Sequence, residues 1–199
     1  ILYFQIFELL NSYMFIIKSN YYLYIENTNN IDLNSLKKNK KISIIYRNNN
    51  IQEDTQKLYK FRKECFIKGI KLYIANNLNL LKSSKADGLY LSSFNKKIYK
   101  NKKFNIIGSA HSFKEINEKI KQGCKTIFLS RLFKTTYKNK KDHLGIIKFN
   151  LITNKYKVQI VPLGGIRTSN LNKLNLVKSD GFALFSEVKK KPVIANRLF

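Results

Sequence analysis

Eight short apolar runs recur along this chain from residue 21 onward, separated by longer polar segments. Nearly continuous apolar runs are expected for parallel strands that are covered on both faces. Strands alternating with crossover segments indicate either a (β/α)₈ TIM barrel or a doubly wound open sheet. The count of eight favours the barrel, as a compact single α/β domain near the lower size limit for that fold. The expected strands are Tyr21–Ile25, Ile42–Tyr46, Leu72–Ala75, Gly88–Leu91, Asn105–Gly108, Thr126–Leu129, Gln159–Leu163 and Gly181–Phe185.

Helical patterns fill several of the gaps between these runs. Two of the segments end at a glycine, which commonly terminates a helix. Ser112 followed by Glu115 predicts a capping box, in which each side chain bonds the other residue's backbone N–H. The connections at 32–40 and 94–100 show no clear helical pattern. The expected helices are Thr55–Lys68, Leu78–Lys85, Ser112–Gln122 and Ser169–Lys178.

The first seventeen residues are markedly apolar, but polar residues interrupt the run. No basic region precedes it and no small-residue cleavage site follows it, which argues against a signal peptide or a membrane span. We therefore expect an amphipathic helix that packs on the domain. The predicted organisation is an N-terminal helical segment at 1–20 and a (β/α)₈ barrel at 21–199, without a membrane-spanning segment.

The chain is strongly basic, with 38 Lys and Arg against 12 Asp and Glu and a formal net charge of +26. Such a charge would ordinarily suggest nucleic acid or an anionic membrane surface. The lysines, however, are spread with asparagines through nearly every polar segment, which is a global compositional bias rather than a local patch. Nucleic acid is therefore not the expected partner. Cys65 and Cys124 lack a metal-ligand spacing, and two free thiols predict a reducing, cytoplasmic location.

The stretch Val161–Thr168 predicts a buried strand, a tight turn and the start of a helix. Gly164 and Gly165 leave backbone N–H groups uncovered at the turn, and a helix N-terminus behind them would add partial positive charge. This arrangement suits a phosphate or another small anion. Glycine pairs at strand ends are also common as plain turns, so the pattern leaves both interpretations open.

Small and polar residues directly follow the apolar runs, where the active site of a barrel would lie. Loops are polar in any fold, but these residues are mostly hydroxyl or backbone donors with a few basic side chains and few carboxylates. They predict an anion-binding rim. The residues are Arg47, Asn48, Asn49, Asn76, Asn77, Ser92, Ser93, Ser109, His111, Ser130, Arg131, Gly164, Gly165 and Ser186.

From about residue 21 to about residue 190, the chain resembles the thiamine-phosphate synthase and thiazole tautomerase family of compact (β/α)₈ barrels. No single motif is diagnostic, and the resemblance depends on the order, spacing and strand-end placement of several stretches. These are Ala86–Leu91, Ile107–Ser112, Phe133–Lys138, His143–Gly145, Leu163–Ile166 and Ser179–Ser186.

The resemblance implies a transferase of thiamine biosynthesis that joins a pyrimidine methyl pyrophosphate to a thiazole phosphate and releases pyrophosphate, with Mg²⁺ as cofactor. It implies catalytic roles for Ser109 and Lys138, which with Arg47 would meet the pyrophosphate. It implies that the thiazole phosphate is bound by Gly164, Gly165, Phe185 and Ser186, under a loop that contains Thr135.

Two departures from the family pattern concern the chemistry. The positions expected to carry Mg²⁺-binding carboxylates are Asn76 and Asn95, whose amide oxygens can bind Mg²⁺ but bring no negative charge. The tautomerase branch would need no metal and would use a histidine after the sixth strand to move a proton, but Arg131 stands there. His111 is expected to be a structural residue and His143 to be exposed.

Four functions therefore stay open. The synthase is the first expectation. A tautomerase, and a barrel that binds a phosphorylated ligand without catalysis, are the alternatives, and a basic nucleic-acid-binding protein is a more remote one. The oligomeric state does not follow from these patterns.

Overall fold

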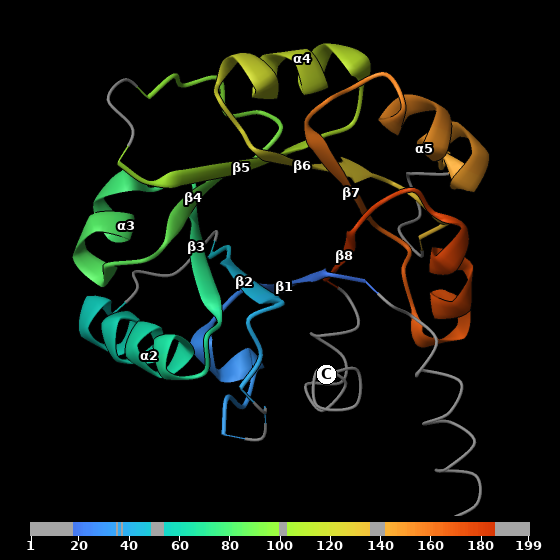
Figure 1. The fold of residues 1–199 in the computed structure, drawn as a ribbon. Helices are drawn as coiled ribbons and strands as arrows, with labels where there is room; N and C mark the ends of the chain where they lie inside the picture. Colours follow the sequence, from blue (N-terminus) through green and yellow to red (C-terminus); the bar gives the residue numbers. More distant parts are fainter. Residues whose placement is uncertain are drawn as a thin grey trace, which may run out of the picture.

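The computed structural model describes residues 18–34, 36, 38–48, 54–99, 103–135 and 142–185. Its eight parallel strands close into a barrel in sequence order, which confirms the (β/α)₈ expectation (Figure 1). The N-terminal segment expected at 1–20 lies almost entirely outside the described residues. The strands are β1 (Asn20–Ile25), β2 (Ile42–Tyr46), β3 (Lys71–Ala75), β4 (Gly88–Leu91), β5 (Asn105–Ala110), β6 (Thr126–Ser130), β7 (Gln159–Leu163) and β8 (Gly181–Leu184).

The pairing of β1 with two neighbours distinguishes the barrel from an open sheet. Tyr21 of β1 is in register with Ile42 of β2 on one side and with Phe182 of β8 on the other. Because the first strand pairs with the last, the sheet has no free edge.

Helices cover the outside of the barrel (Figure 1). Those expected at 55–68, 78–85 and 112–122 are present within one residue of their predicted ends. The expected α-helix at 169–178 is instead a 3₁₀ helix, and residues 92–99 of the connection from β4 to β5 contain no helix. The helices are η1 (Thr28–Asn30), α2 (Thr55–Ile67), α3 (Leu78–Ser84), α4 (Phe113–Lys121), α5 (Gly145–Thr153) and η2 (Thr168–Leu176).

The predicted capping box of α4 forms only in part. Ser112 Oγ accepts a hydrogen bond from the backbone N–H of Glu115 at 3.3 Å, as expected for an N-cap. The Glu115 carboxylate, however, accepts from the backbone N–H of His111 at 2.7 Å, one residue before the cap. The expectation of a reciprocal box was therefore wrong in its second half, because Glu115 reaches past the cap to the end of β5.

Alternation along the strands divides the core into two parts. Outward-facing aliphatic side chains pack under the helices, whereas the side chains directed into the barrel form a separate cluster rich in aromatic residues. Tyr24 contacts Tyr90, Phe128 and Phe185 in edge-to-face geometry, with ring centroids 5.5–6.0 Å apart. The interior of the barrel is thus filled by packed aromatic side chains.

Neither Cys65 nor Cys124 forms a disulfide, as predicted, and both are buried. Burial raises the pKa of the Cys65 thiol to about 12. Along the described part of the chain, no helix combines the length and the apolar character needed to cross a membrane.

Candidate active site at the mouth of the barrel

Three consecutive strands each place a serine at the mouth of the barrel. The inner-cluster residues of β4, β5 and β6 are followed two positions later by Ser92, Ser109 and Ser130, and side chains alternate along a strand, so these serines also face inward. Ser109 is buried, and its hydroxyl lies close to Tyr90. The structure therefore brings hydroxyl donors together at the edge predicted from sequence.

Arg47 follows β2 and lies above the aromatic cluster. Its backbone N–H continues the sheet by donating to Ile25 O at 2.8 Å. Its side-chain Nε is buried, with no hydrogen-bond partner among the described residues. Burial raises the pKa of Tyr24 well above its ordinary value, and the nearby guanidinium of Arg47 opposes that shift. A buried guanidinium N–H without an acceptor is a donor that an anionic ligand could satisfy.

The glycine turn after β7 is built as predicted. Gly164 and Gly165 have φ values of +90° and +72°, a left-handed region that glycine adopts without strain. The loop after β6 runs alongside the turn, because Phe133 N donates to Gly164 O at 3.1 Å. Thr135 follows in that loop, and its buried Oγ1 lacks a hydrogen-bond partner among the described residues. The phosphate-binding interpretation thus gains an unpartnered hydroxyl beside the turn.

The helix that follows this turn differs from the expected one. The helix is present at Thr168–Leu176, but it is a 3₁₀ helix, which is tighter than an α-helix. The Asn170 side chain ties the start of this helix to the turn: its Oδ1 accepts from Arg167 N, and its Nδ2 donates to Gly165 O, both at 2.9 Å. Anion binding at this turn would depend on the glycine backbone and the neighbouring loop.

Asn76 and Asn95, the expected metal ligands, do come together. Asn95 Nδ2 donates to Asn76 Oδ1 at 3.0 Å. Asn76 Oδ1 also accepts from Ser92 N at 3.0 Å, and Asn76 Nδ2 donates to Ser92 Oγ at 2.8 Å. Asn76 adopts a left-handed φ of 58°, which asparagine tolerates better than most residues. The two loops after β3 and β4 are therefore locked to each other by this pair.

The donor set of this pair does not fit Mg²⁺. Asn76 Oδ1 already accepts two hydrogen bonds, and Asn95 Oδ1 accepts one from Lys97 N at 2.9 Å. A hard cation normally requires carboxylates or free oxygen ligands. Within the described ranges, no three His, Cys, Asp or Glu side chains gather as a metal site. The expectation of Mg²⁺ stays a prediction.

His111 reaches the end of β6 from β5. Its Nδ1 lies 2.8 Å from Ser130 Oγ. Arg131, the next residue, is engaged elsewhere: its Nη2 donates to Asp142 O at 2.9 Å. The imidazole of His111 therefore lies close to Arg131, the position at which a tautomerase would be expected to have its histidine. His143 is exposed, as expected.

Of the remaining predicted site residues, Phe185 lies in the described part of the chain. It follows the end of β8 and packs against the inner cluster, with its ring centroid 6.0 Å from that of Tyr24. Lys138 and Ser186 lie outside the described residues.

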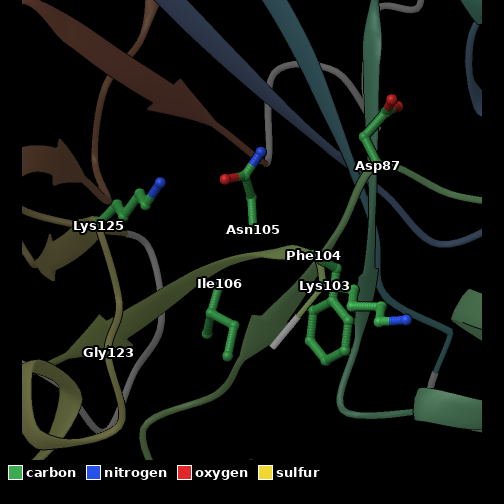
Figure 2. Close-up of a pocket in the computed structure, with 7 residues that line it drawn as sticks. All are labelled: Asp87, Lys103, Phe104, Asn105, Ile106, Gly123 and Lys125. Atoms are coloured by element: carbon green, nitrogen blue, oxygen red, sulfur yellow. The ribbon is translucent and has the colours of Figure 1, made fainter. Parts of the chain in front are cut away.

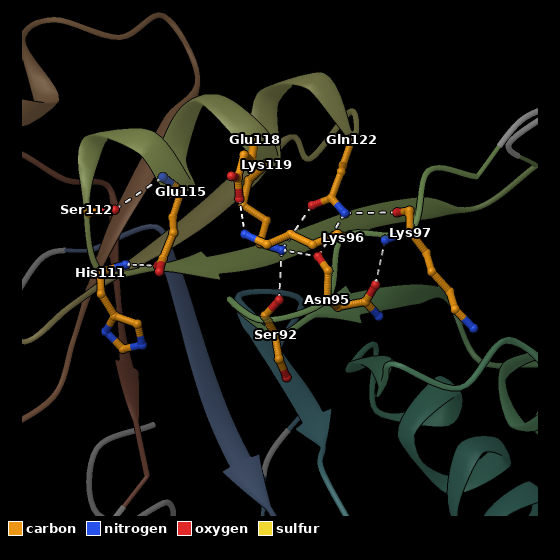
Figure 3. A network of polar contacts seen from close by, with 10 residues as sticks. All are labelled: Ser92, Asn95, Lys96, Lys97, His111, Ser112, Glu115, Glu118, Lys119 and Gln122. Carbon is orange, nitrogen blue, oxygen red and sulfur yellow. Dashed lines mark hydrogen bonds and ion pairs between the residues drawn. The ribbon is translucent and has the colours of Figure 1, made fainter.

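Lys119, which was not predicted from the sequence, donates three hydrogen bonds under the loop after β4 (Figure 3). A lysine on an amphipathic helix is normally predicted to be exposed, and nothing in the sequence around Lys119 indicated that it would be buried.

A cavity of about 380 Å³ lies at the opposite end of the barrel (Figure 2). It is open and lies at the amino ends of β4, β5 and β6. Its one carboxylate, Asp87, is committed to structure, because it accepts from Arg62 Nη2 at 2.7 Å and from Leu72 N at 2.8 Å. Asp87 is therefore a structural residue and not a free carboxylate of this cavity. The cavity is lined by Asp87, Lys103, Phe104, Asn105, Ile106, Gly123 and Lys125.

Comparison with known proteins places this architecture in context. Residues 25–188 match the sequence model of the family described as thiamine monophosphate synthase. A thiamine-phosphate synthase of Prochlorococcus marinus (strain MED4) is 34% identical over 109 residues, which are 52% of this chain and 31% of the relative. A thiamine-phosphate synthase of Clostridium acetobutylicum is 27% identical over 133 residues, 64% of this chain and 63% of the relative. The chain thus spans less than two thirds of these relatives' lengths.

Among solved structures, thiamine phosphate pyrophosphorylase from Pyrococcus furiosus matches with a TM-score of 0.73 and 19% identity, over 92% of this chain and 94% of that one. KGPDC from Streptococcus mutans matches with a TM-score of 0.60 and 9% identity, over 91% and 95%. Likeness at such identities supports the fold alone.

Proposed function

The chain belongs to the thiamine monophosphate synthase family, and on this premise we propose that it joins a hydroxymethylpyrimidine pyrophosphate to a thiazole phosphate to form thiamine phosphate. The bond between the pyrimidine methylene carbon and the pyrophosphate oxygen breaks, and pyrophosphate leaves with the electron pair. The thiazole nitrogen donates its lone pair to that carbon. The observation that carries this proposal is the family match over residues 25–188.

The leaving pyrophosphate needs positive charge and hydrogen-bond donors in a site shielded from water. Arg47 supplies a half-buried guanidinium whose Nε is buried and has no partner among the described residues. Ser109 hydrogen-bonds Tyr90, which also lies close enough to Arg47 to feel its charge, and it supplies a hydroxyl donor in the barrel mouth. Lys138 is proposed as a further cation for the pyrophosphate on the basis of its sequence position.

The second substrate would bind on the opposite side of the mouth. The turn at Gly164 and Gly165 and the hydroxyl of Thr135 would hold the thiazole phosphate, with Ser186 as a further donor by sequence position. Phe185 would pack against the thiazole ring from the aromatic cluster. Holding both substrates in one orientation would supply much of the rate enhancement, because the carbocation-like centre needs a nitrogen close by.

A thiazole tautomerase is the second candidate, and the contact between His111 and Ser130 favours it. The imidazole lies at the end of β6, where tautomerase chemistry would need a group that moves a proton. The neutral ring can accept a proton at one nitrogen while the other is held by Ser130.

Synthase turnover by the purified chain tests the proposal. Both substrates and Mg²⁺ are supplied, and thiamine phosphate is followed. Ser109→Ala is expected to lower kcat by about 10²-fold, in the range of other lost transition-state donors. Lys125→Met, at the opposite end of the barrel, is the matched control and should leave turnover unchanged. The alternative outcome has two parts. The chain would form no thiamine phosphate but would convert one isomer of a thiazole carboxylate phosphate to the other, and His111→Asn would abolish that conversion. This result would establish the tautomerase instead.

A further inference from the structure

Asn76, Ser92 and Asn95 form one corner of the rim through their mutual hydrogen bonds. The loop that carries Ser92 and Asn95 rests on a buried lysine (Figure 3). Lys119 of α4 is 0% exposed. Its Nζ donates to Ser92 O at 2.7 Å, to Asn95 O at 2.8 Å and to Gln122 Oε1 at 2.9 Å. Three donated bonds need three N–H groups, so the side chain is an ammonium and not a neutral amine. A positive charge is therefore held inside the loop that carries Asn95.

None of the three acceptors of Lys119 is a carboxylate. Burial lowers the pKa of Lys119, which expresses the cost of holding this charge away from water. The neighbouring strand accommodates the side chain, since a β-carbon at Gly108 would lie 2.9 Å from Lys119 Cδ. A buried charge whose hydrogen bonds are all to neutral oxygens adds positive potential to the rim above it.

The orientation of the two asparagine amides follows from donors whose identity is certain. The backbone N–H of Ser92 can only donate, so the atom of Asn76 that it meets is the oxygen; the backbone N–H of Lys97 identifies the Asn95 oxygen in the same way. Each Nδ2 then uses one hydrogen inside the cluster. Its second hydrogen has no acceptor among the described residues. The cluster therefore turns its oxygens inward and keeps N–H donors for a ligand.

Donors combined with a buried cation suit an anion, whereas a metal would need the oxygens turned outward. We propose that the Asn76–Ser92–Asn95 corner binds the pyrophosphate group directly, without a metal ion bound by the protein, and that Lys119 is the positioning residue that makes this possible. The identity of the anion rests on the proposed function. Lys119 acts through the 92–97 loop, which it holds in place, and through its charge.

Calorimetric titration of the full chain with inorganic pyrophosphate tests this inference. Binding is expected in EDTA, with affinity that Mg²⁺ changes by less than about threefold. Lys119→Met retains the stem but removes the charge and the donors, and should weaken binding by at least about tenfold. Lys121→Met removes an exposed charge from the same helix and should leave the affinity unchanged.

A second variant decides the question if Lys119→Met does not fold. Asn76→Asp combined with Asn95→Asp is nearly isosteric, but replaces two N–H donors with carboxylate oxygens. Pyrophosphate binding in EDTA should fall by at least about tenfold, and Mg²⁺ should restore it, because the new oxygens suit the cation. Asn117→Asp adds a negative charge at an exposed position of α4 outside the rim, and serves as the charge control.

The outcomes separate this inference from the proposed function. Metal-independent pyrophosphate binding without thiamine phosphate formation would overturn the synthase proposal and leave the inference standing. Wild-type binding that is abolished by EDTA, or an aspartate double variant that binds in EDTA as the wild type does, would overturn the inference whatever the turnover.

Discussion

Gly165 and Phe133 are in contact so close that a β-carbon on Gly165 would lie 2.3 Å from the Phe133 carbonyl oxygen. This contact joins the turn after β7 to the loop after β6 that leads to Thr135. The two parts of the proposed thiazole phosphate site therefore pack through backbone atoms. A steric clash caused by a β-carbon at Gly165 could not be relieved by the movement of a side chain.

Gly165→Ala is expected to lower the free energy of unfolding by about 3 kcal/mol, from left-handed strain together with the backbone clash. Gly145→Ala is the matched control. Gly145 has a similar φ of +69°, but a β-carbon there would have nothing within 4 Å, so strain alone should cost about 1 kcal/mol. Urea unfolding of both variants measures the difference, and equal losses would show that the Phe133 contact is relaxed in solution.

Arg47→Met is expected to weaken pyrophosphate binding by about tenfold to a hundredfold, because it removes a charged donor aimed into the barrel mouth. Lys125→Met, which removes one charge at the opposite end of the barrel (Figure 2), should leave the affinity unchanged. Titration calorimetry gives both affinities. Equal weakening in the two variants would mean that binding follows net charge and not the rim.

Asp87→Ala is expected to lower the free energy of unfolding by about 2 kcal/mol. The carboxylate is paired with Arg62, and it also accepts from the backbone N–H of Leu72, so its loss leaves two donors without a partner. The exposed pair of Lys96 and Glu118 provides the comparison, and Glu118→Gln should cause no measurable loss. Chemical unfolding curves compare the variants, and equal stabilities would contradict a structural role for Asp87.

Cys65 is expected to make the chain less stable at alkaline pH. Its pKa is raised by burial to about 12 in the folded chain, against 9.0 for the ordinary thiol. The unfolded chain therefore binds fewer protons between these values, and stability falls as pH rises through that window, by up to about 1.4 kcal/mol per pH unit. Well below pH 9 the thiol is protonated in both the folded and the unfolded chain and does not affect the pH dependence of stability.

Unfolding free energies at pH 8 and pH 10.5 check this expectation. Cys65→Ala removes the titrating group, so its stability should fall less between the two pH values than that of the wild type. An equal fall in the free energy of unfolding of both chains would show that other groups cause the loss of stability at alkaline pH. The buried Tyr24, Tyr73 and Tyr90 are such groups, because burial raises their pKa values as well.

Local patterns were sufficient to predict most of the fold. Strands β2, β4 and β7 have their predicted ends, and the other five were found within one or two residues, because a strand covered on both faces must be apolar at nearly every position. The helix after β7 was the main error. Its apolar spacing is compatible with helix, but Asn170 bonds Arg167 N and Gly165 O and stabilises a tighter 3₁₀ start.

The position of the rim also followed from the sequence alone, since strand ends of a parallel barrel share one edge and their polar residues must meet there. What that rim can bind was decided by tertiary structure. The direction of the Asn76 amide depends on Ser92, sixteen residues away, and the charge of Lys119 matters because the loop after β4 closes over it. Residue types and strand periodicity are local properties, whereas hydrogen-bond direction and burial of charge arise between segments that only folding brings together.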